Sequence, residues 1–162
     1  MLVLKRLADA RAAGDRIYAC VEGSAIAHSG ASHGLTAPNG RAQAQVIRRA
    51  LEAARVTAGA LDLIEAHGVG APISDRVELR ALQAVLAESP RPAPCWVASV
   101  KTNLGHLEAA AGVASVIKTA LALYHDTIPR HVGLERPVEE LAQAAAWLAV
   151  DDTDLVTRTT GR

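Results

Sequence analysis

Hydrophobic residues recur along this chain with two spacings, one typical of helices and one typical of buried strands. Helical spacing occurs in three early segments: 2–13, the stretch opened by Pro38-Asn39-Gly40, and 75–88. Short apolar runs typical of strands alternate with them at 17–28, 61–66 and 95–100. Strands that alternate with helices predict an α/β fold with a mainly parallel sheet and right-handed crossovers.

The later segments differ in how apolar they are. Residues 107–125 form a helical pattern with so few polar side chains that we expect a central helix buried nearly all round, covered on two sides. Weaker signals predict a helix at 138–150, and 151–162 reads as a polar, frayed tail after one domain over 1–150. We expect the helix of 75–88 to begin at Asp75, with Glu78 completing a capping box.

Composition limits the partners of this chain. Of its 162 residues 50% are hydrophobic and 2% aromatic, so alanine-rich elements must approach closely to fill a core. The 17 basic and 17 acidic residues cancel, which favours neither nucleic acid nor a membrane surface as a partner. The sequence shows no secretory signal or membrane span, and Cys20 and Cys95 lack metal-binding spacing. We expect a cytoplasmic protein with two inert, buried thiols.

Two histidines lie in glycine-bearing loops after predicted strands. His67 lies in Ile64-Glu65-Ala66-His67-Gly68-Val69-Gly70, and His106 ends Lys101-Thr102-Asn103-Leu104-Gly105-His106. Because parallel strands end at one edge of a sheet, both imidazoles are expected at an edge where ligands bind. Each histidine alone has a simpler interpretation, in which it only hydrogen-bonds nearby backbone groups. A zinc site of Glu65, His67 and His106 lacks a further strong ligand with fitting spacing, so we predict no metal.

These motifs together resemble one enzyme family. Residues 101–112 carry in full the pattern Lys-x-Asn-x-Gly-His-Leu-Glu-Ala-Ala-Ala-Gly, residues 65–68 read Glu-Ala-His-Gly, and Gly34-Leu35-Thr36-Ala37-Pro38-Asn39-Gly40 precedes both. The set is similar to the β-ketoacyl synthases, or ketosynthases, of modular polyketide assembly. The resemblance implies the C-terminal half of a thiolase-like fold, incomplete relative to the family, whose nucleophilic cysteine belongs to a preceding half.

The resemblance also implies roles for individual residues. His67 and His106 would be catalytic, donating N–H groups to a thioester oxygen on which negative charge develops. Lys101, Asn103 and Glu108 would support them, with Glu108 as the nearest carboxylate partner for Lys101.

The loop after His67 would meet the substrate arm. By resemblance, Gly68, Val69, Gly70 and Ala71 line the path of phosphopantetheine, the prosthetic group of an acyl carrier protein. Family members usually carry threonines where this chain has Val69 and Ala71, so two hydroxyl groups that bind the arm are lost. An arm amide left without a partner in a buried tunnel would cost about 1–3 kcal/mol.

The implied reaction is decarboxylative Claisen condensation of acyl and malonyl thioesters on acyl carrier protein. The chain would need no cofactor of its own, and it would contribute the two-histidine part of the site. Its partners would be the carrier protein and either a cysteine-bearing N-terminal ketosynthase half or a second copy of itself. The alternative is a non-catalytic ketosynthase-like scaffold or the remnant of a disrupted synthase gene.

Overall fold

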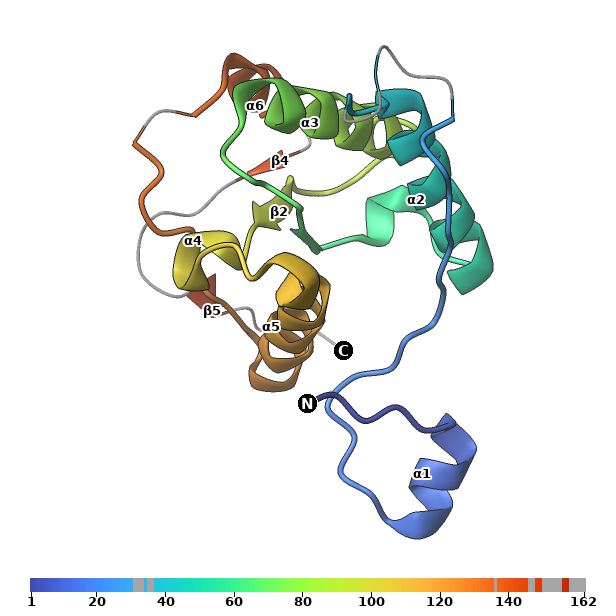
Figure 1. Cartoon of the computed structure of the whole chain (residues 1–162). Coiled ribbons are helices and arrows are strands. Elements are labelled where there is room, and N and C mark those ends of the chain that lie inside the picture. Colours follow the sequence, from blue (N-terminus) through green and yellow to red (C-terminus); the bar gives the residue numbers. More distant parts are fainter. Residues whose placement is uncertain (31–33, 35–36, 136, 146–147, 150–155, 158–162) are drawn as a thin grey trace.

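A computed structural model of the chain describes residues 1–30, 34, 37–135, 137–145, 148–149 and 156–157 (Figure 1). A parallel sheet of order β1-β2-β4 lies at its centre, formed by Leu63–Glu65, Cys95–Ala98 and Leu148–Ala149. Leu63 pairs with Trp96 and Glu65 with Ala98, so β1 and β2 end side by side. The predicted α/β class and parallel sheet are confirmed.

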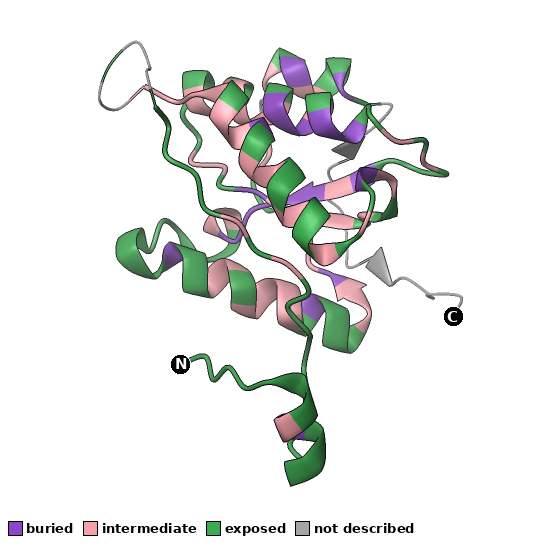
Figure 2. Cartoon of the chain, turned by 90° about the vertical axis from the view of Figure 1, so that its right-hand side faces the viewer, coloured by how far each residue is buried: buried purple, intermediate pink, exposed green. Residues whose placement is uncertain are grey.

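Two helices pack together over one face of this sheet. They are α2, Gly40–Ala54, and α3, Pro72–Leu86, and a short 3-10 turn, η1 (Ala58–Ala60), follows α2. Buried residues concentrate on α3 and β2 (Figure 2), where Val85, Leu86 and Cys95 are almost completely enclosed. The core is therefore the contact between this helical layer and the sheet, and the thiol of Cys95 is buried as predicted.

The starts of α2 and α3 differ in how well they were predicted. The Asn39 side chain accepts a hydrogen bond from the Ala42 N–H at 3.2 Å, which caps α2 where the sequence indicated. The predicted capping box at Asp75 is wrong, because α3 begins earlier, at Pro72, with no side-chain cap. Proline suits the first turn of a helix because its missing N–H has no helical partner there.

The opposite face carries the histidine-bearing segment. It comprises α4 (Lys101–Leu104), a 3-10 turn η2 (Glu108–Ala110) and α5 (Ala111–His125). The prediction that this last helix is buried nearly all round is wrong for the described chain. Only Ala111 and Ala122 of α5 are buried, whereas Leu123 is 64% exposed. One side of α5 faces the sheet. The described residues leave most of its apolar outer side uncovered, although Tyr18 packs against Tyr124 with ring centroids 4.9 Å apart.

The N-terminal region departs furthest from prediction. The helix expected over 2–13 is confined to α1, Leu7–Ala13, which projects from the body of the molecule (Figure 1). The strand expected over 17–28 is absent from the described structure, since these residues are extended but pair with no described strand. Cys20 is exposed, so the prediction that it is buried is wrong. A strand needs a partner for its backbone groups, and hydrophobicity alone does not supply one.

The C-terminal region is also more broken than predicted. The helix expected over 138–150 is wrong, because α6 spans only Glu139–Gln143 and residues 148–149 form β4 beside β2. Within the predicted tail, β5 (Val156–Thr157) pairs antiparallel with β3 (Thr127–Ile128). The other residues of 151–162 lie outside the described part, so the frayed tail stays a prediction.

Candidate functional site

The two histidines meet beyond the ends of β1 and β2. His67 follows β1 by two residues, and His106 follows α4, which begins three residues after β2. Their ring centroids are 5.9 Å apart, and the rings stand nearly perpendicular, at 87°. Both side chains are exposed. The sequence therefore predicted correctly that both imidazoles lie together at one edge of the sheet, although this geometry alone does not test their catalytic role.

The hydrogen bonds of the rings define which nitrogen can donate. Nδ1 of His106 accepts the N–H of Glu108 at 3.0 Å. Nδ1 of His67 lies 3.5 Å from Nζ of Lys101, which can only donate. In a neutral imidazole whose Nδ1 accepts, the proton resides on Nε2. His106 is thus arranged to present an Nε2–H donor, the group that an oxyanion requires, and the Lys101 ammonium near Nδ1 favours the same tautomer in His67.

Lys101 and Glu108 do not act as the expected pair. Nζ of Lys101 donates to the backbone oxygen of His67 at 2.6 Å, and the two residues Lys101 and Glu108 form no ion pair in the described structure. Glu108 instead has a φ of 49°, a left-handed conformation that is uncommon for a residue with a side chain. Its contribution to the site is the backbone N–H that binds His106.

Asn103 has a local role in the structure. Its side-chain amide donates to the backbone oxygen of Arg130 at 3.2 Å, which links α4 to the segment after β3. This contact holds the segment that carries His106 but does not reach either imidazole.

Two carboxylates of α3 hold the loop after His67. The oxygens of Glu78 accept the N–H groups of His67 at 2.7 Å and Gly68 at 2.9 Å. The Asp75 carboxylate faces the backbone N–H groups of Val69 and Gly70. Burial and the nearby Glu78 carboxylate raise the pKa of Asp75, while the N–H groups of Val69 and Gly70 act to lower it. Glu78 therefore binds two consecutive backbone N–H groups from the side of α3, and Asp75 faces the next two.

Gly68 is required by this loop for two reasons. Its φ is 45°, and a Cβ atom there would lie 3.0 Å from Cβ of Ser99. Ser99 is itself buried beneath the loop. The sequence had marked Gly68, Val69, Gly70 and Ala71 as the substrate loop, and it lies directly beside His67. Asp75 and Glu78, the two carboxylates beside this loop, were noticed in the sequence, but their spacing was interpreted as a helix cap.

Glu65 points away from the imidazoles and does not join them in a metal site. Its Oε2 lies 3.0 Å from Nζ of Lys118 in α5, and its Oε1 accepts the N–H of Val100. No cluster of three metal-ligating side chains occurs among the described residues. Sequence reasoning missed Lys118, although a lone lysine in an otherwise apolar helix is a signal for a buried ion pair.

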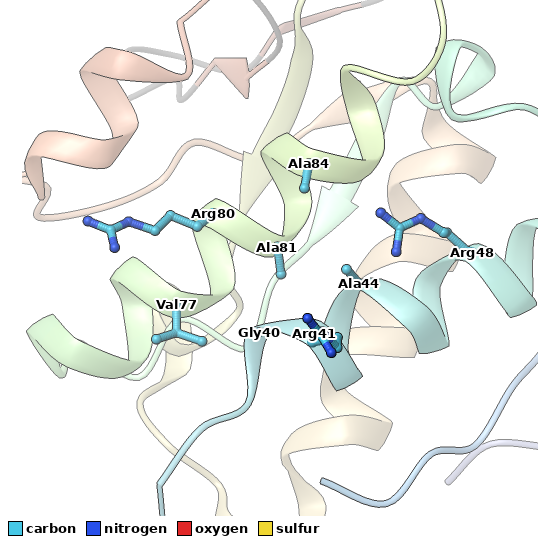
Figure 3. A pocket seen from close by; sticks show the side chains of 8 residues that line it. All are labelled: Gly40, Arg41, Ala44, Arg48, Val77, Arg80, Ala81 and Ala84. Atoms are coloured by element: carbon cyan, nitrogen blue, oxygen red, sulfur yellow. The ribbon is translucent and has the colours of Figure 1, made fainter. Parts of the chain in front are cut away.

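Two hollows flank α3. One, of about 420 Å³, lies on the α3 side of the histidine loop and is lined by Gly68, Gly70, Glu78 and Thr102 among others. The second, of about 470 Å³, lies between α2 and α3 (Figure 3). Its rim carries Arg41, Arg48 and Arg80 around small side chains, and neither histidine lines it. Only the first of these two hollows adjoins the candidate site.

Fold and site together define the histidine-bearing part of a ketosynthase. The family model described as "Beta-ketoacyl synthase, C-terminal domain" matches residues 18–135, and the chain belongs to this family.

Curated relatives are modular polyketide synthases. The chain is 48% identical over 158 residues to polyketide synthase GfsA of Streptomyces halstedii, covering 91% of this chain and 2% of that protein. It is 46% identical over 160 residues to erythronolide synthase EryA3 of Saccharopolyspora erythraea, covering 92% of this chain and 5% of the relative. The chain thus spans only a small part of the length of these relatives.

Solved ketosynthases share its fold. The ketosynthase from module 6 of the bacillaene synthase of Bacillus subtilis 168 superposes with a TM-score of 0.90 and 35% identity, over 98% of this chain and 29% of that one. The oxazolomycin ketosynthase domain OzmH KS7 of Streptomyces albus JA3453 gives 0.88 and 34%, over 98% and 28%. The chain is therefore a partial ketosynthase domain of polyketide synthase type, and the likenesses do not favour the scaffold or remnant alternative.

None of the helices in the described residues combines the length and apolar character needed to cross a lipid bilayer.

Proposed function

We propose that this chain supplies the two-histidine part of a β-ketoacyl synthase site for decarboxylative Claisen condensation. The observation that supports this most directly is the imidazole pair, with centroids 5.9 Å apart, Nδ1 of His106 accepting a backbone N–H and Nδ1 of His67 facing the Lys101 ammonium. Two Nε2–H donors can then stabilise one developing oxyanion. Removing a single donor of this kind typically costs about 3–4 kcal/mol of transition-state stabilisation.

The chemistry divides into two steps. In the first, the bond between Cα and the carboxylate of a malonyl thioester breaks, carbon dioxide leaves, and the electron pair becomes an enolate held by His67 and His106. In the second, the enolate carbon attacks an acyl group on a cysteine, a carbon–carbon bond forms, and the cysteine thiolate leaves. The first step needs only groups on this chain, whereas the second needs the cysteine of an N-terminal half.

The substrate arm would meet the loop after His67. Glu78 binds the N–H groups of His67 and Gly68, and the carbonyl oxygens of these two residues already accept from Lys101 and Ser99. The carbonyl oxygens of Val69 and Gly70 would therefore accept the amide N–H groups of phosphopantetheine. Val69 and Ala71 offer no hydroxyl group, so the arm would be held by these oxygens and by apolar contact. An acyl carrier protein is accordingly the proposed substrate partner. The cytoplasmic location stays a prediction.

The test is loss of carbon dioxide from malonyl-loaded acyl carrier protein. The full chain should accelerate it, and His106→Ala should abolish most of the acceleration. His28→Ala is the matched control, because His28 is also exposed and its Nδ1 also accepts a backbone N–H, from Gly30 at 2.9 Å. Equal rates with the parent chain and His106→Ala would refute the role of the pair.

Condensation needs a second arm of the experiment. A cysteine-bearing N-terminal ketosynthase half, loaded with an acyl group, is added to the same mixture. A β-ketoacyl product would support the whole reaction. A stable complex of the two halves that decarboxylates malonyl thioester but gives no product would restrict the function to decarboxylation.

A further inference from the structure

A buried ion pair lies directly behind the two histidine loops. Nζ of Lys118 stands 3.0 Å from Oε2 of Glu65, and their side chains are only 9% and 6% exposed. In the other ion pairs of the described chain, at least one side chain is about half exposed or more. Water screens the Glu65–Lys118 attraction least, and the loss of either partner would leave an uncompensated charge in the interior.

The Glu65 carboxylate connects three elements. Its residue ends β1, one of its oxygens accepts the N–H of Val100 at the junction of β2 and α4, and the other faces Lys118 in α5. Apolar contacts could join the same elements, but they have no fixed direction. The hydrogen bond from the Val100 N–H fixes the direction of one Glu65 oxygen, and charge attraction holds the other 3.0 Å from Nζ of Lys118.

These connections determine where the two imidazoles can lie. His67 follows Glu65 by two residues, and His106 lies in the segment that runs from Val100 to α5. Glu65 is therefore attached to both ends of the segment that carries His106 and directly precedes the loop that carries His67. A shift of either attachment would change the distance between the rings.

We propose that Glu65 and Lys118 act as a positioning pair, which holds the two loops so that the His67 and His106 imidazoles stay adjacent. This inference rests on the function proposed for the two histidines. Neither Glu65 nor Lys118 touches the reacting atoms. They would act on the geometry of the two imidazole N–H donors. Substituting either residue should therefore change the rate of the chemical step more than it changes substrate binding.

A third group provides an internal indicator of the pair. His131 lies near both charges, and burial, together with the Lys118 ammonium, lowers its pKa, whereas Glu65 acts to raise it. Lys118→Met removes the charge that lowers the pKa of His131 and leaves Glu65 in place, so this pKa should rise. This shift shows that the substitution has acted at the intended place.

The decisive measurement is the nuclear Overhauser effect between the ring protons of His67 and His106 in the full chain. We expect this signal in the parent and its loss in Lys118→Met and in Glu65→Gln. The double variant should recover it in part, because neither charge is then left uncompensated in the interior and the introduced glutamine can still accept the Val100 N–H. Lys5→Met is the matched control, since Lys5 forms an exposed pair with Asp15 at 2.6 Å.

An unchanged signal in both single variants, with an unchanged circular dichroism spectrum, would overturn the proposal. If neutralising either residue unfolds the chain, Glu65→Asp decides. It keeps the charge but withdraws the carboxylate by one methylene group, so the signal should weaken while the fold remains. Retention of the full signal in Glu65→Asp would then refute the positioning role.

Activity separates this inference from the proposed function. In the decarboxylation assay, Lys118→Met should lower kcat and leave KM nearly unchanged, and Lys118→Arg should restore part of kcat. No decarboxylation by the parent chain would refute the function proposed for the histidines, whereas the ring-to-ring signal would still test the positioning pair by itself.

Discussion

Replacing Glu78 by glutamine tests how the loop after His67 is held. The two oxygens of Glu78 accept N–H groups from His67 at 2.7 Å and Gly68 at 2.9 Å. A glutamine of the same size has one accepting oxygen, and its NH₂ group would face the other N–H donor. The variant therefore loses one charge-assisted hydrogen bond and weakens the other, without opening a cavity.

The expected magnitude follows from the exposure of the two donors. Hydrogen bonds to charged groups contribute about 1.5–3 kcal/mol each when no water replaces them. The bond to His67 is exposed and the bond to Gly68 is partly buried, so water can compensate the first more readily. We expect a total loss of about 2–3 kcal/mol in loop stability, which corresponds to a roughly 30- to 150-fold larger open population.

Amide hydrogen exchange measures that population directly. The exchange rate of the Gly68 amide should rise by this factor in Glu78→Gln under conditions where exchange reports the opening equilibrium. Glu52→Gln, an exposed change on α2, should leave the rate unchanged. If both variants exchange at Gly68 as slowly as the parent, the carboxylate does not hold this loop and the argument fails.

Three further outcomes follow. Val116→Lys on the exposed side of α5 should reduce self-association and binding to an N-terminal ketosynthase half in sedimentation experiments, and unchanged sedimentation would refute a role for that face. Burial acts to raise the pKa of Glu140, but its own backbone N–H, Arg80 and Arg76 outweigh this and lower it. Stability from Glu140 is therefore present at neutral pH and lost on acidification through that lowered pKa. Arg80→Ala should raise that pKa in a carboxyl NMR titration, and an unchanged value would contradict the contact. Because the folded pKa of Asp75 is raised above its usual 3.8, its stabilising effect is lost as pH rises through the folded value. Asp75→Asn should gain stability relative to the parent between acidic and neutral pH in urea unfolding, and a constant difference would refute this sign.

The sequence predicted the site better than it predicted the elements around it. The His67 and His106 loops were placed correctly because each follows a short apolar strand, and parallel strands end together. The contacts of Lys101 and Glu108 were not predictable in the same way. They depend on the left-handed backbone of Glu108 and on the approach of Lys101 to the His67 carbonyl, which are tertiary features.

Segments that need a distant partner were predicted least well. Residues 17–28 have the composition of a strand, and 107–125 has that of a buried helix, yet in the described chain the first is unpaired and α5 is half exposed. Composition records what surrounds a segment in its complete fold, and local structure forms only when those surroundings are present. The difference between the predicted and the observed surroundings of these two segments therefore indicates which surfaces need a partner to cover them.

The exposed apolar side of α5 is large enough that a partner covering it would also affect the geometry of the two histidines. Val113, Val116, Leu121, Leu123 and Tyr124 are each 42–64% exposed along α5. Full burial of such a side chain contributes about 1.5–3 kcal/mol, so covering the exposed half of all five would contribute roughly 5 kcal/mol. Lys118 projects from the same helix to Glu65, behind the imidazoles. A partner that covers α5 would thus also restrain the helix on which the positioning pair depends, and the ring-to-ring signal of His67 and His106 should strengthen when the N-terminal half binds.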